Sequence, residues 1–182
     1  MTIKYAQSSE RIKWKSVLSQ NEQQSQQDYL KQCKEAAVKG NVIAQNTLGY
    51  LYLNGQGIKQ DYKAAVQWFK SASKEGYAAA QYNLAIMYKL GQGVDQSHPD
   101  SIKWMQASAN QGYADAQSNL GNMYYQGLAV MQDYTLALMW WTLAEQSGAK
   151  NIEHNMCDIK GKMSPSQLQQ TEQLVRQWKT KH

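Results

Sequence analysis

Apolar residues along the chain recur at the spacing of amphipathic helices, and these helices come in pairs. The first helix of one pair is marked by an i, i+4, i+7, i+8 pattern: Ala44, Leu48, Leu51 and Tyr52. A second apolar stripe follows after a polar break: Ala65, Trp68, Phe69 and Ala72. The composition, rich in Ala, Leu, Met and Gln and with only two prolines, also favours helix over strand. The pattern therefore predicts an all-α chain built from helical hairpins.

The sequence pattern of this helical pair occurs three times, with a period of 36 residues. Glycines mark the boundaries of the units: Gly40, Gly76, Gly112 and Gly148. Leucines hold one position of each first helix: Leu48, Leu84 and Leu120. Tryptophans hold one position of each second helix, where we expect them to be buried: Trp68, Trp104 and Trp140. A fixed period of this length indicates a repeat solenoid, with full repeats over about 41–76, 77–112 and 113–148.

Residues suited to turns and helix caps separate the helices. Gly55 and Gly57 tolerate the left-handed conformation that ends a helix, so the first helix is expected to stop there. Asp61 is placed to cap the second helix, and Asp133 has the same position in the third unit. In the second unit, "SHPD" predicts a capping box between Ser97 and Asp100.

The two ends of the chain are expected to close the solenoid, which would make 28–182 a single domain. Residues 28–39 carry second-helix spacing, 21–27 suggest a polar linker, and 9–18 predict a short helix. In 149–182, a degenerate first helix is expected to place two residues in the registers of Ala44 and Leu48: Ile152 and Met156. A final helix follows, capped by Ser164 and Gln167, with an apolar side: Leu168, Leu174, Val175 and Trp178.

Composition and charge limit the possible functions and compartments. The formal net charge is +5, but residues 40–148 carry six bases and seven acids, so the repeats are close to neutral. This argues against a phosphate-tracking surface, and no nucleic-acid partner is expected. No apolar run is long enough to span a membrane, and the N-terminus lacks a signal-peptide core. We expect a cytoplasmic protein, or a periplasmic or secreted one if a leader was removed. Cys33 and Cys157 are expected to be buried, reduced thiols.

The combined motif A-x-x-x-L-G-x-x-Y-x-x-G-x-G-[IV]…D-x-x-x-A-x-x-W…A-x-x-G resembles the SEL-1-like repeat family, a relative of the tetratricopeptide repeats. The resemblance covers roughly residues 28–180. The departures keep small or capping residues: Ala85, Ser97, Ser101, Ser108 and Ala129. The resemblance implies a right-handed α-solenoid whose first helices line a concave surface, and a role as a bacterial adaptor or scaffold for other proteins.

Candidate catalytic and metal-binding residues are few and scattered. Ser71 and Lys74 match the S-x-x-K spacing of serine β-lactamases, but the K-T-G and S-D-N motifs are missing. His154 and Cys157 share a helix face, yet two ligands do not make a zinc site. We therefore expect no enzyme, no cofactor and no metal. A β-lactamase-like hydrolase is kept as the alternative from a different functional class.

A partner surface is expected on the side of the first helices that faces away from Leu48. At 100° per residue, positions 43, 46, 50 and 53 of the first unit point that way, as do their equivalents 36 and 72 residues later. The candidate contact residues are uncharged for the most part: Asn46, Tyr50, Leu53, Tyr82, Ile86, Lys89, Asp115, Asn122 and Tyr125. We expect a non-catalytic module that binds a peptide or protein there, with Tyr50, Tyr82 and Tyr125 as its anchors. Two alternatives stay open: an immunity protein that occludes a bacterial toxin, and contacts of these residues with the terminal helices.

Overall fold

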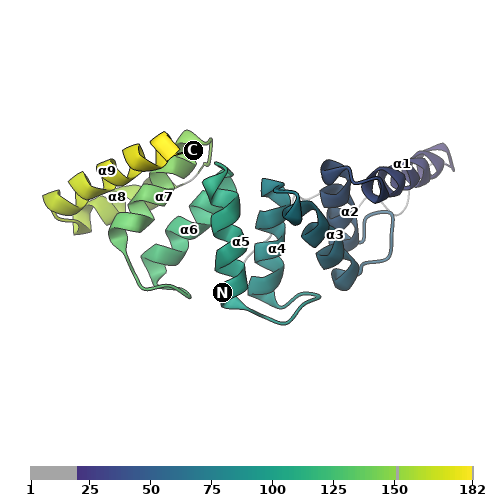
Figure 1. Ribbon diagram of the computed structural model, residues 1–182, viewed down its shortest axis with the longest axis horizontal. Helices are drawn as coiled ribbons and strands as arrows, with labels where there is room; N and C mark the ends of the chain where they lie inside the picture. The colour runs from purple at the N-terminus through teal and green to yellow at the C-terminus, as the bar shows by residue number, and fades with distance from the viewer. Residues whose placement is uncertain (1–19, 151, 182) are drawn as a thin grey trace.

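The chain folds into a stack of antiparallel helices that follow one another in sequence order (Figure 1). The computed structural model describes residues 20–150 and 152–181, and this part of the chain is helical without strands. The helices are as follows: α1 Gln20–Val38, α2 Val42–Asn54, α3 Tyr62–Lys74, α4 Ala78–Leu90, α5 His98–Asn110, α6 Ala114–Gln126, α7 Tyr134–Gln146, α8 Glu153–Lys162 and α9 Pro165–Lys181. The expected all-α solenoid is confirmed.

Each repeat is a helical pair: α2 with α3, α4 with α5, and α6 with α7. Successive repeats join because α3 also packs on α4, and α5 on α6. The leucines at the centre of the first helices are fully buried: Leu48, Leu84 and Leu120. A single helical pair cannot cover these faces, so the units depend on their neighbours for stability.

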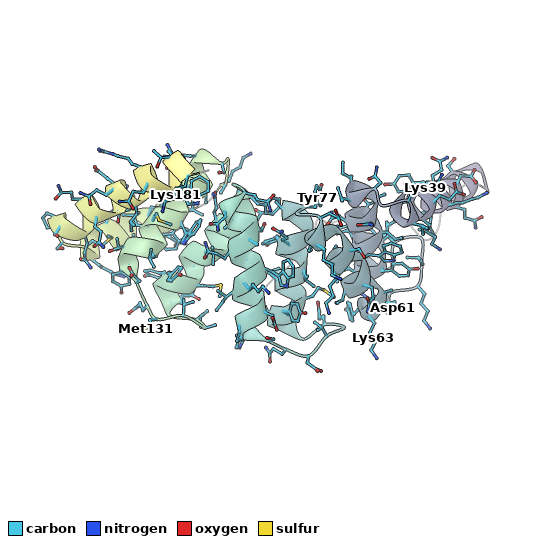
Figure 2. All side chains as sticks on the ribbon, viewed as in Figure 1. Lys39, Asp61, Lys63, Tyr77, Met131 and Lys181 are labelled. Carbon is cyan, nitrogen blue, oxygen red and sulfur yellow. The ribbon has the colours of Figure 1, made fainter. Side chains whose placement is uncertain are left out.

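The turns within the repeats form as the glycines predict. Gly55, Gly91 and Gly127 follow the first helices with φ of 66°, 65° and 66°. In this left-handed conformation each donates its N–H to the last turn of its helix. These turns and the second-helix N-termini share one edge of the stack, where Figure 2 labels Asp61, Lys63 and Met131.

The second helices are capped by the predicted residues, with one difference of detail. The side chains of Asp61, Ser97 and Asp133 accept the N–H of the third helical residue. Asp100 does not reach back to the Ser97 N–H, as a capping box requires, but accepts the Ser97 hydroxyl at 2.6 Å. The reason is that the Ser97 N–H already donates to the Tyr88 carbonyl at 3.0 Å.

A buried glutamine ties each repeat to the helix before it. Gln45 donates from Nε2 to the carbonyl of Ala37 at the end of α1, over 3.1 Å. The equivalent residues repeat the bond to the helices that precede them: Gln81 to Ser73 and Gln117 to Ala109. Each of these carbonyls also accepts the N–H of the boundary glycine of its repeat, Gly40, Gly76 or Gly112, so the glutamine adds a second bond that joins the two helices.

The tryptophans are less uniform than the sequence suggests. Trp140 is 4% exposed, whereas Trp68 and Trp104 are only half-buried. The fully buried side chains stand one position later: Phe69, Met105 and Trp141. Because the outer edge of the second helices faces solvent in the first two repeats, the expectation of full burial was wrong for Trp68 and Trp104.

Close helix crossings explain why the next position is so well buried. A Cβ atom on Gly49 would lie 2.7 Å from the Phe69 ring, and one on Gly121 would overlap the Trp141 indole. In the second repeat the small residue is Ala85, and it faces the narrower Met105 within one core. The size of the first-helix residue therefore varies inversely with that of its second-helix partner.

At the N-terminal end the structure corrects the sequence analysis. Residues 21–27, expected to be a polar linker, lie within α1. Glutamine and glutamate are good helix formers, and a polar helix suits the end of a solenoid, where one face remains in water. The short helix expected over 9–18 lies outside the described residues.

At the C-terminal end, α8 has the expected first-helix register, since Ile152 and Met156 are buried. Helix α9 packs along α7 (Figure 1). The Thr171 hydroxyl lies between the Gln167 carbonyl of its own helix, at 3.0 Å, and the Thr135 carbonyl of α7, at 3.4 Å, and Met139 is buried in the cluster that includes Val175. The outer side of α7 is therefore covered, unlike that of α3 or α5.

Both described cysteines are free, and only one is buried as expected. Cys33 lies in the core between α1 and α2, where burial raises the pKa of its thiol. Cys157 is exposed, because its register on α8 faces away from Ile152 and Met156. None of the described helices is long and apolar enough to cross a membrane.

Candidate functional site

The surface expected to hold a partner consists of the first-helix positions that face away from the core. We call it the first-helix face, and it comprises the predicted contact residues together with Ile43, Ala79 and Ser118. Its most exposed large apolar side chains are on α2, where Ile43 is 60% and Tyr50 49% exposed. Asn46 lies between them on the same helix and accepts the amide of Asn83 at 3.0 Å.

The middle of this face is more tightly packed than its α2 end. Tyr82 is half-buried, with its ring centre 5.3 Å from that of Tyr113, and its hydroxyl accepts the Asn119 amide at 3.4 Å. Ile86 packs against the core cluster of the second and third repeats. Tyr82 therefore contributes to the joint between repeats, which the sequence analysis did not foresee.

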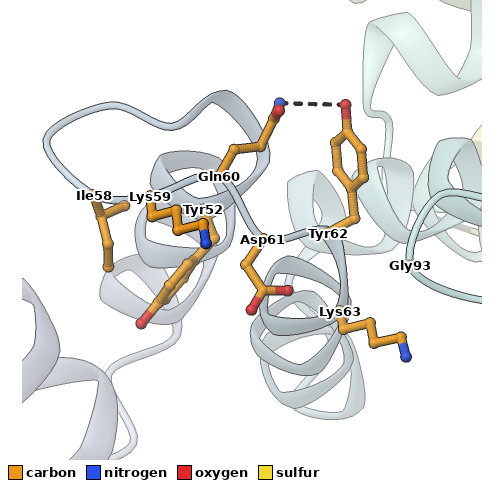
Figure 3. A pocket seen from close by; sticks show the side chains of 8 residues that line it. All are labelled: Tyr52, Ile58, Lys59, Gln60, Asp61, Tyr62, Lys63 and Gly93. Carbon is orange, nitrogen blue, oxygen red and sulfur yellow. Dashed lines mark hydrogen bonds between the residues drawn. The ribbon is translucent and has the colours of Figure 1, made fainter.

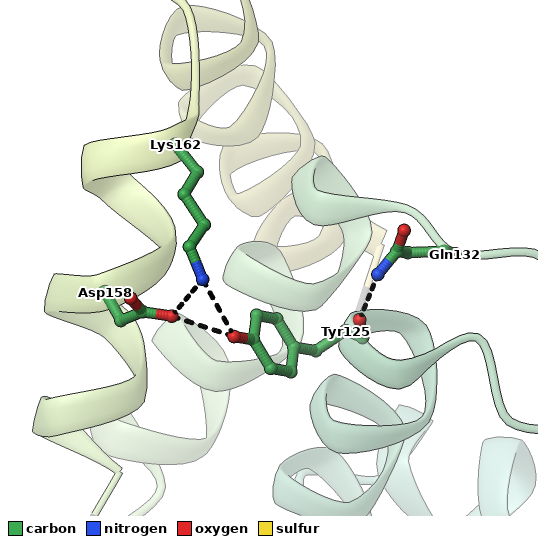
Figure 4. Close-up of polar contacts among 4 residues, drawn as sticks. All are labelled: Tyr125, Gln132, Asp158 and Lys162. Atoms are coloured by element: carbon green, nitrogen blue, oxygen red, sulfur yellow. Dashed lines mark hydrogen bonds and ion pairs between the residues drawn. The ribbon is translucent and has the colours of Figure 1, made fainter.

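The third tyrosine of the face is engaged by the terminal helix α8 (Figure 4). The Tyr125 hydroxyl donates to Asp158 at 2.8 Å and accepts from Lys162 at 3.2 Å. Its ring stacks on Tyr134 at 5.7 Å and tilts against Trp141 at 5.4 Å between centres. Tyr125 is thus held by four neighbours within the chain.

The charges around Tyr125 are coupled. Lys162 and then Tyr125, as hydrogen-bond donors, lower the pKa of the Asp158 carboxyl. In return the Asp158 carboxylate raises the pKa of Lys162 far above its usual range. The Asp158–Lys162 ion pair at 2.7 Å lies on the surface, so it orders the end of the face rather than stabilising the fold strongly.

The remaining predicted contact residues differ in exposure. Leu53 packs partly into the first-repeat core, while Lys89 and Asn122 are half-buried and Asp115 is exposed. Asp115 lies near Tyr113, whose hydroxyl pKa is raised first by burial and then by that carboxylate. The accessible part of the first-helix face is therefore concentrated on α2.

A separate hollow of about 670 Å³ lies at the turn edge between the first two repeats (Figure 3). Its polar groups hold the local turn together. Gln60 donates from Nε2 to the Leu53 carbonyl at 2.7 Å and to the Tyr62 hydroxyl at 3.2 Å, and Asp61 caps α3. Equivalent glutamines make the same carbonyl bond in the other repeats: Gln96 and Gln132. The polar groups beside the hollow are therefore engaged in local turn and cap contacts.

The residues considered for catalysis or metal binding are not assembled into a centre. Ser71 donates its hydroxyl to the Gln67 carbonyl of its own helix at 3.2 Å. His154 and Cys157 are both exposed on α8. Within the residues that the structure describes, no three His, Cys, Asp or Glu side chains come together in a metal-binding group.

Paired helices that repeat every 36 residues define the molecule as an α-solenoid repeat protein. The family model of the Sel1 repeat matches residues 42–77, 78–113 and 114–148, and the chain belongs to this family. Sel1 repeat proteins are generally non-catalytic scaffolds for protein–protein interaction.

Solved structures agree with this assignment. A Sel1 repeat protein from Oxalobacter formigenes is similar with a TM-score of 0.67 and 28% identity, over 73% of this chain and 56% of its own. A protective antigen present in uropathogenic Escherichia coli strains, which displays an SLR fold, gives a TM-score of 0.60 and 29% identity. That match covers 82% of this chain and 40% of the antigen. The chain thus spans about half the length of these relatives. None of the curated proteins compared with the chain matches it.

Proposed function

We propose that this protein is a non-catalytic interaction module that binds a peptide or protein on its first-helix face, at the α2 end. The observation that carries the proposal is the pair of exposed apolar side chains on one helix side, Ile43 and Tyr50, with the Asn46 amide between them. Large apolar groups in water are a cost to the free protein unless a partner covers them. Tyrosine at such a position offers apolar area and a hydroxyl with little loss of side-chain entropy.

Two features favour the α2 end over the rest of the face. Tyr82 and Tyr125, the other predicted anchors, already contact Tyr113, Asn119, Asp158 or Lys162 within the chain. Binding a partner there requires those contacts to be given up first. A partner that binds at Tyr50 does not have to displace such contacts, and the positions around Tyr50 carry no charge that needs a counter-ion.

The test compares Tyr50→Ala with Tyr29→Ala. Tyr29 is 55% exposed but lies on α1, outside the first-helix face, so it controls for loss of an exposed tyrosine. Immobilised wild-type protein, Tyr50→Ala and Tyr29→Ala are each incubated with lysate of the source cells, and bound proteins are quantified by mass spectrometry.

The expected result is a protein captured by wild type and by Tyr29→Ala but depleted at least about tenfold with Tyr50→Ala, which equals 1.4 kcal/mol. The melting temperatures should stay close to that of the wild type, since both side chains are about half in water. Equal capture by Tyr50→Ala would remove the α2 end as the binding surface.

A further inference from the structure

The second helices present another surface, on the side opposite their partner first helices. In α3, Ala65 and Phe69 are fully buried against α2, so positions 63, 67, 70 and 74 point away from it at 100° per residue. The same registers are 27, 31, 34 and 38 in α1 and 99, 103, 106 and 110 in α5. We call these twelve positions the second-helix face. The equivalent side of α7 is covered by α9.

Charge on the second-helix face has a single sign. Six of its positions are lysine and none is acidic: Lys31, Lys34, Lys63, Lys70, Lys74 and Lys103. The predicted contact residues of the first-helix face include one base and one acid, Lys89 and Asp115, which cancel. The fold therefore sorts charge by face. The net charge of 40–148 hides this sorting, because four of the six lysines in that nearly neutral segment lie on this one face.

Two of the acids in the repeats serve as helix caps, away from these lysines. Asp61 and Asp133 accept backbone N–H groups at helix N-termini, at the turn edge. None of the six lysines forms an ion pair with any acid that the structure describes. Five of the six are exposed, while Lys70 is half-buried with its ammonium 5.6 Å from the centre of the Tyr88 ring. The twelve positions therefore carry six positive charges without a direct ion pair to a described acid, although Asp28 and Glu35 lie within one turn of Lys31 on α1.

We propose that the second-helix face of α1, α3 and α5 binds an acidic segment of a partner protein, a stretch of aspartates and glutamates. Lysine ammonium groups are mobile point charges that suit carboxylates without fixed geometry. None of the twelve positions is arginine, which gives bidentate contact with phosphate, and none is aromatic; the half-buried Trp68 and Trp104 border the face, and the Lys103 ammonium lies 5.7 Å from the centre of the Trp104 ring. Val38 is its only large aliphatic residue, which leaves little to insert into a bilayer.

This inference is independent of the proposed function, because the two surfaces lie on different helices. A partner can contact the α2 end of the first-helix face, the acidic-segment site, or both. The Tyr50→Ala variant should therefore bind an acidic probe as well as the wild type does.

The probe is a fluorescent oligo-glutamate peptide, titrated with the full chain at low and at high sodium chloride. The test variant carries Lys31→Glu, Lys63→Glu and Lys103→Glu, one exposed lysine on each of the three helices. The control variant carries Lys150→Glu, Lys160→Glu and Lys179→Glu, three exposed positions outside both faces, so its net charge changes equally away from the second-helix face. Circular dichroism melts establish that both variants remain folded.

Wild type and control are expected to bind the peptide with an affinity that falls as salt rises, and the test variant at least about tenfold more weakly. Equal losses in the two triple variants would overturn the proposal, because net charge alone would then explain binding. Absence of binding at low salt would overturn it as well. So would tighter binding of duplex DNA or phosphatidylserine vesicles than of oligo-glutamate at the same salt, since the partner class would be wrong.

Discussion

The first and third repeats have the same helical pair but differ in what covers them. In the third repeat, Trp140 is 4% exposed in a core to which α9 contributes, and Tyr125 is bound by Asp158 and Lys162 of α8. In the first repeat, Trp68 is half-buried and Tyr50 is 49% exposed. The position of a residue within the repeat thus determines the direction of its side chain. Contact with a terminal helix determines whether that side chain remains exposed to a partner.

The largest expected effect concerns the tryptophans at equivalent positions. Trp140→Ala should lower the free energy of unfolding by about 3–5 kcal/mol, because a fully enclosed ring leaves a large cavity. Trp68→Ala should cost about half as much, since its outer edge already contacts water. Urea unfolding followed by far-UV circular dichroism measures both. Equal losses would mean that α9 adds nothing to the burial of the third repeat.

The next effect concerns the glycines at the helix crossings. Gly121→Ala should lower stability by about 1–3 kcal/mol, because the new methyl group overlaps the Trp141 indole. Gly161→Ala is the control: no atom lies within 4 Å of its Cβ position, so it should be neutral or stabilise α8 by up to about 1 kcal/mol.

A double-mutant cycle sharpens this test. Trp141→Met should be less harmful in the Gly121→Ala background than in the wild type, since the second repeat combines Ala85 with Met105 at the same positions. Additive losses in the cycle would show that the two residues do not compete for the same space.

A smaller, opposite effect is expected in the turn of the third repeat. Ala129 has a φ of 62°, where the first repeat has Gly57 at 70°. Ala129→Gly should raise stability by about 1 kcal/mol, because the left-handed conformation strains a residue with a Cβ. Ala107→Gly, inside α5, should instead lower it by about 1 kcal/mol. A melting temperature that falls for both would contradict the strain at position 129.

The smallest effect concerns the contacts of Asp158 with Lys162 and Tyr125 at the end of the third repeat. The pKa of Asp158 is below its ordinary value of 3.8, so its contribution to stability is present above about pH 4 and is lost as pH falls through the folded pKa. Lys162→Gln should raise that pKa, and Tyr125→Phe should raise it less, following the order of their effects. Carbon NMR titration of the carboxyl group measures both shifts. An unchanged pKa in Lys162→Gln would contradict the contact.

The repeat and its caps were predictable because they depend on local chemistry. The N-caps at Asp61 and Asp133 and the left-handed turn at Gly55 were expected from residue type and spacing, and the structure has them. The second-helix residue that packs against each glycine or alanine at a helix crossing was not expected. The pairing of Gly49 with Phe69, and of Ala85 with Met105, is visible in the sequence once the crossing is known, but the period alone does not say which positions meet.

The terminal helices could be predicted only in part, because they break the repeat. The apolar residues of α9, such as Val175 and Trp178, predicted a helix with one buried side. They did not predict that this side would lie along α7. That placement depends on the outward side of α7, where Thr135 and Met139 are less polar than Lys63 and Gln67 at the equivalent positions of α3. Contact of some face residues with the terminal helices was left open, and the structure has it for Tyr125; its partners Asp158 and Lys162 could not be named beforehand, because they lie outside the three full repeats.

The buried glutamines Gln45, Gln81 and Gln117 each donate their side-chain amide to the helix immediately before them. None of these bonds depends on the total number of repeats in the chain. A chain carrying a duplicated copy of 77–112 would offer a glutamine donor and a helix C-terminal carbonyl acceptor at its one new junction. The molecule is therefore built to change length by whole units, and evolution or engineering can lengthen it without redesigning a joint.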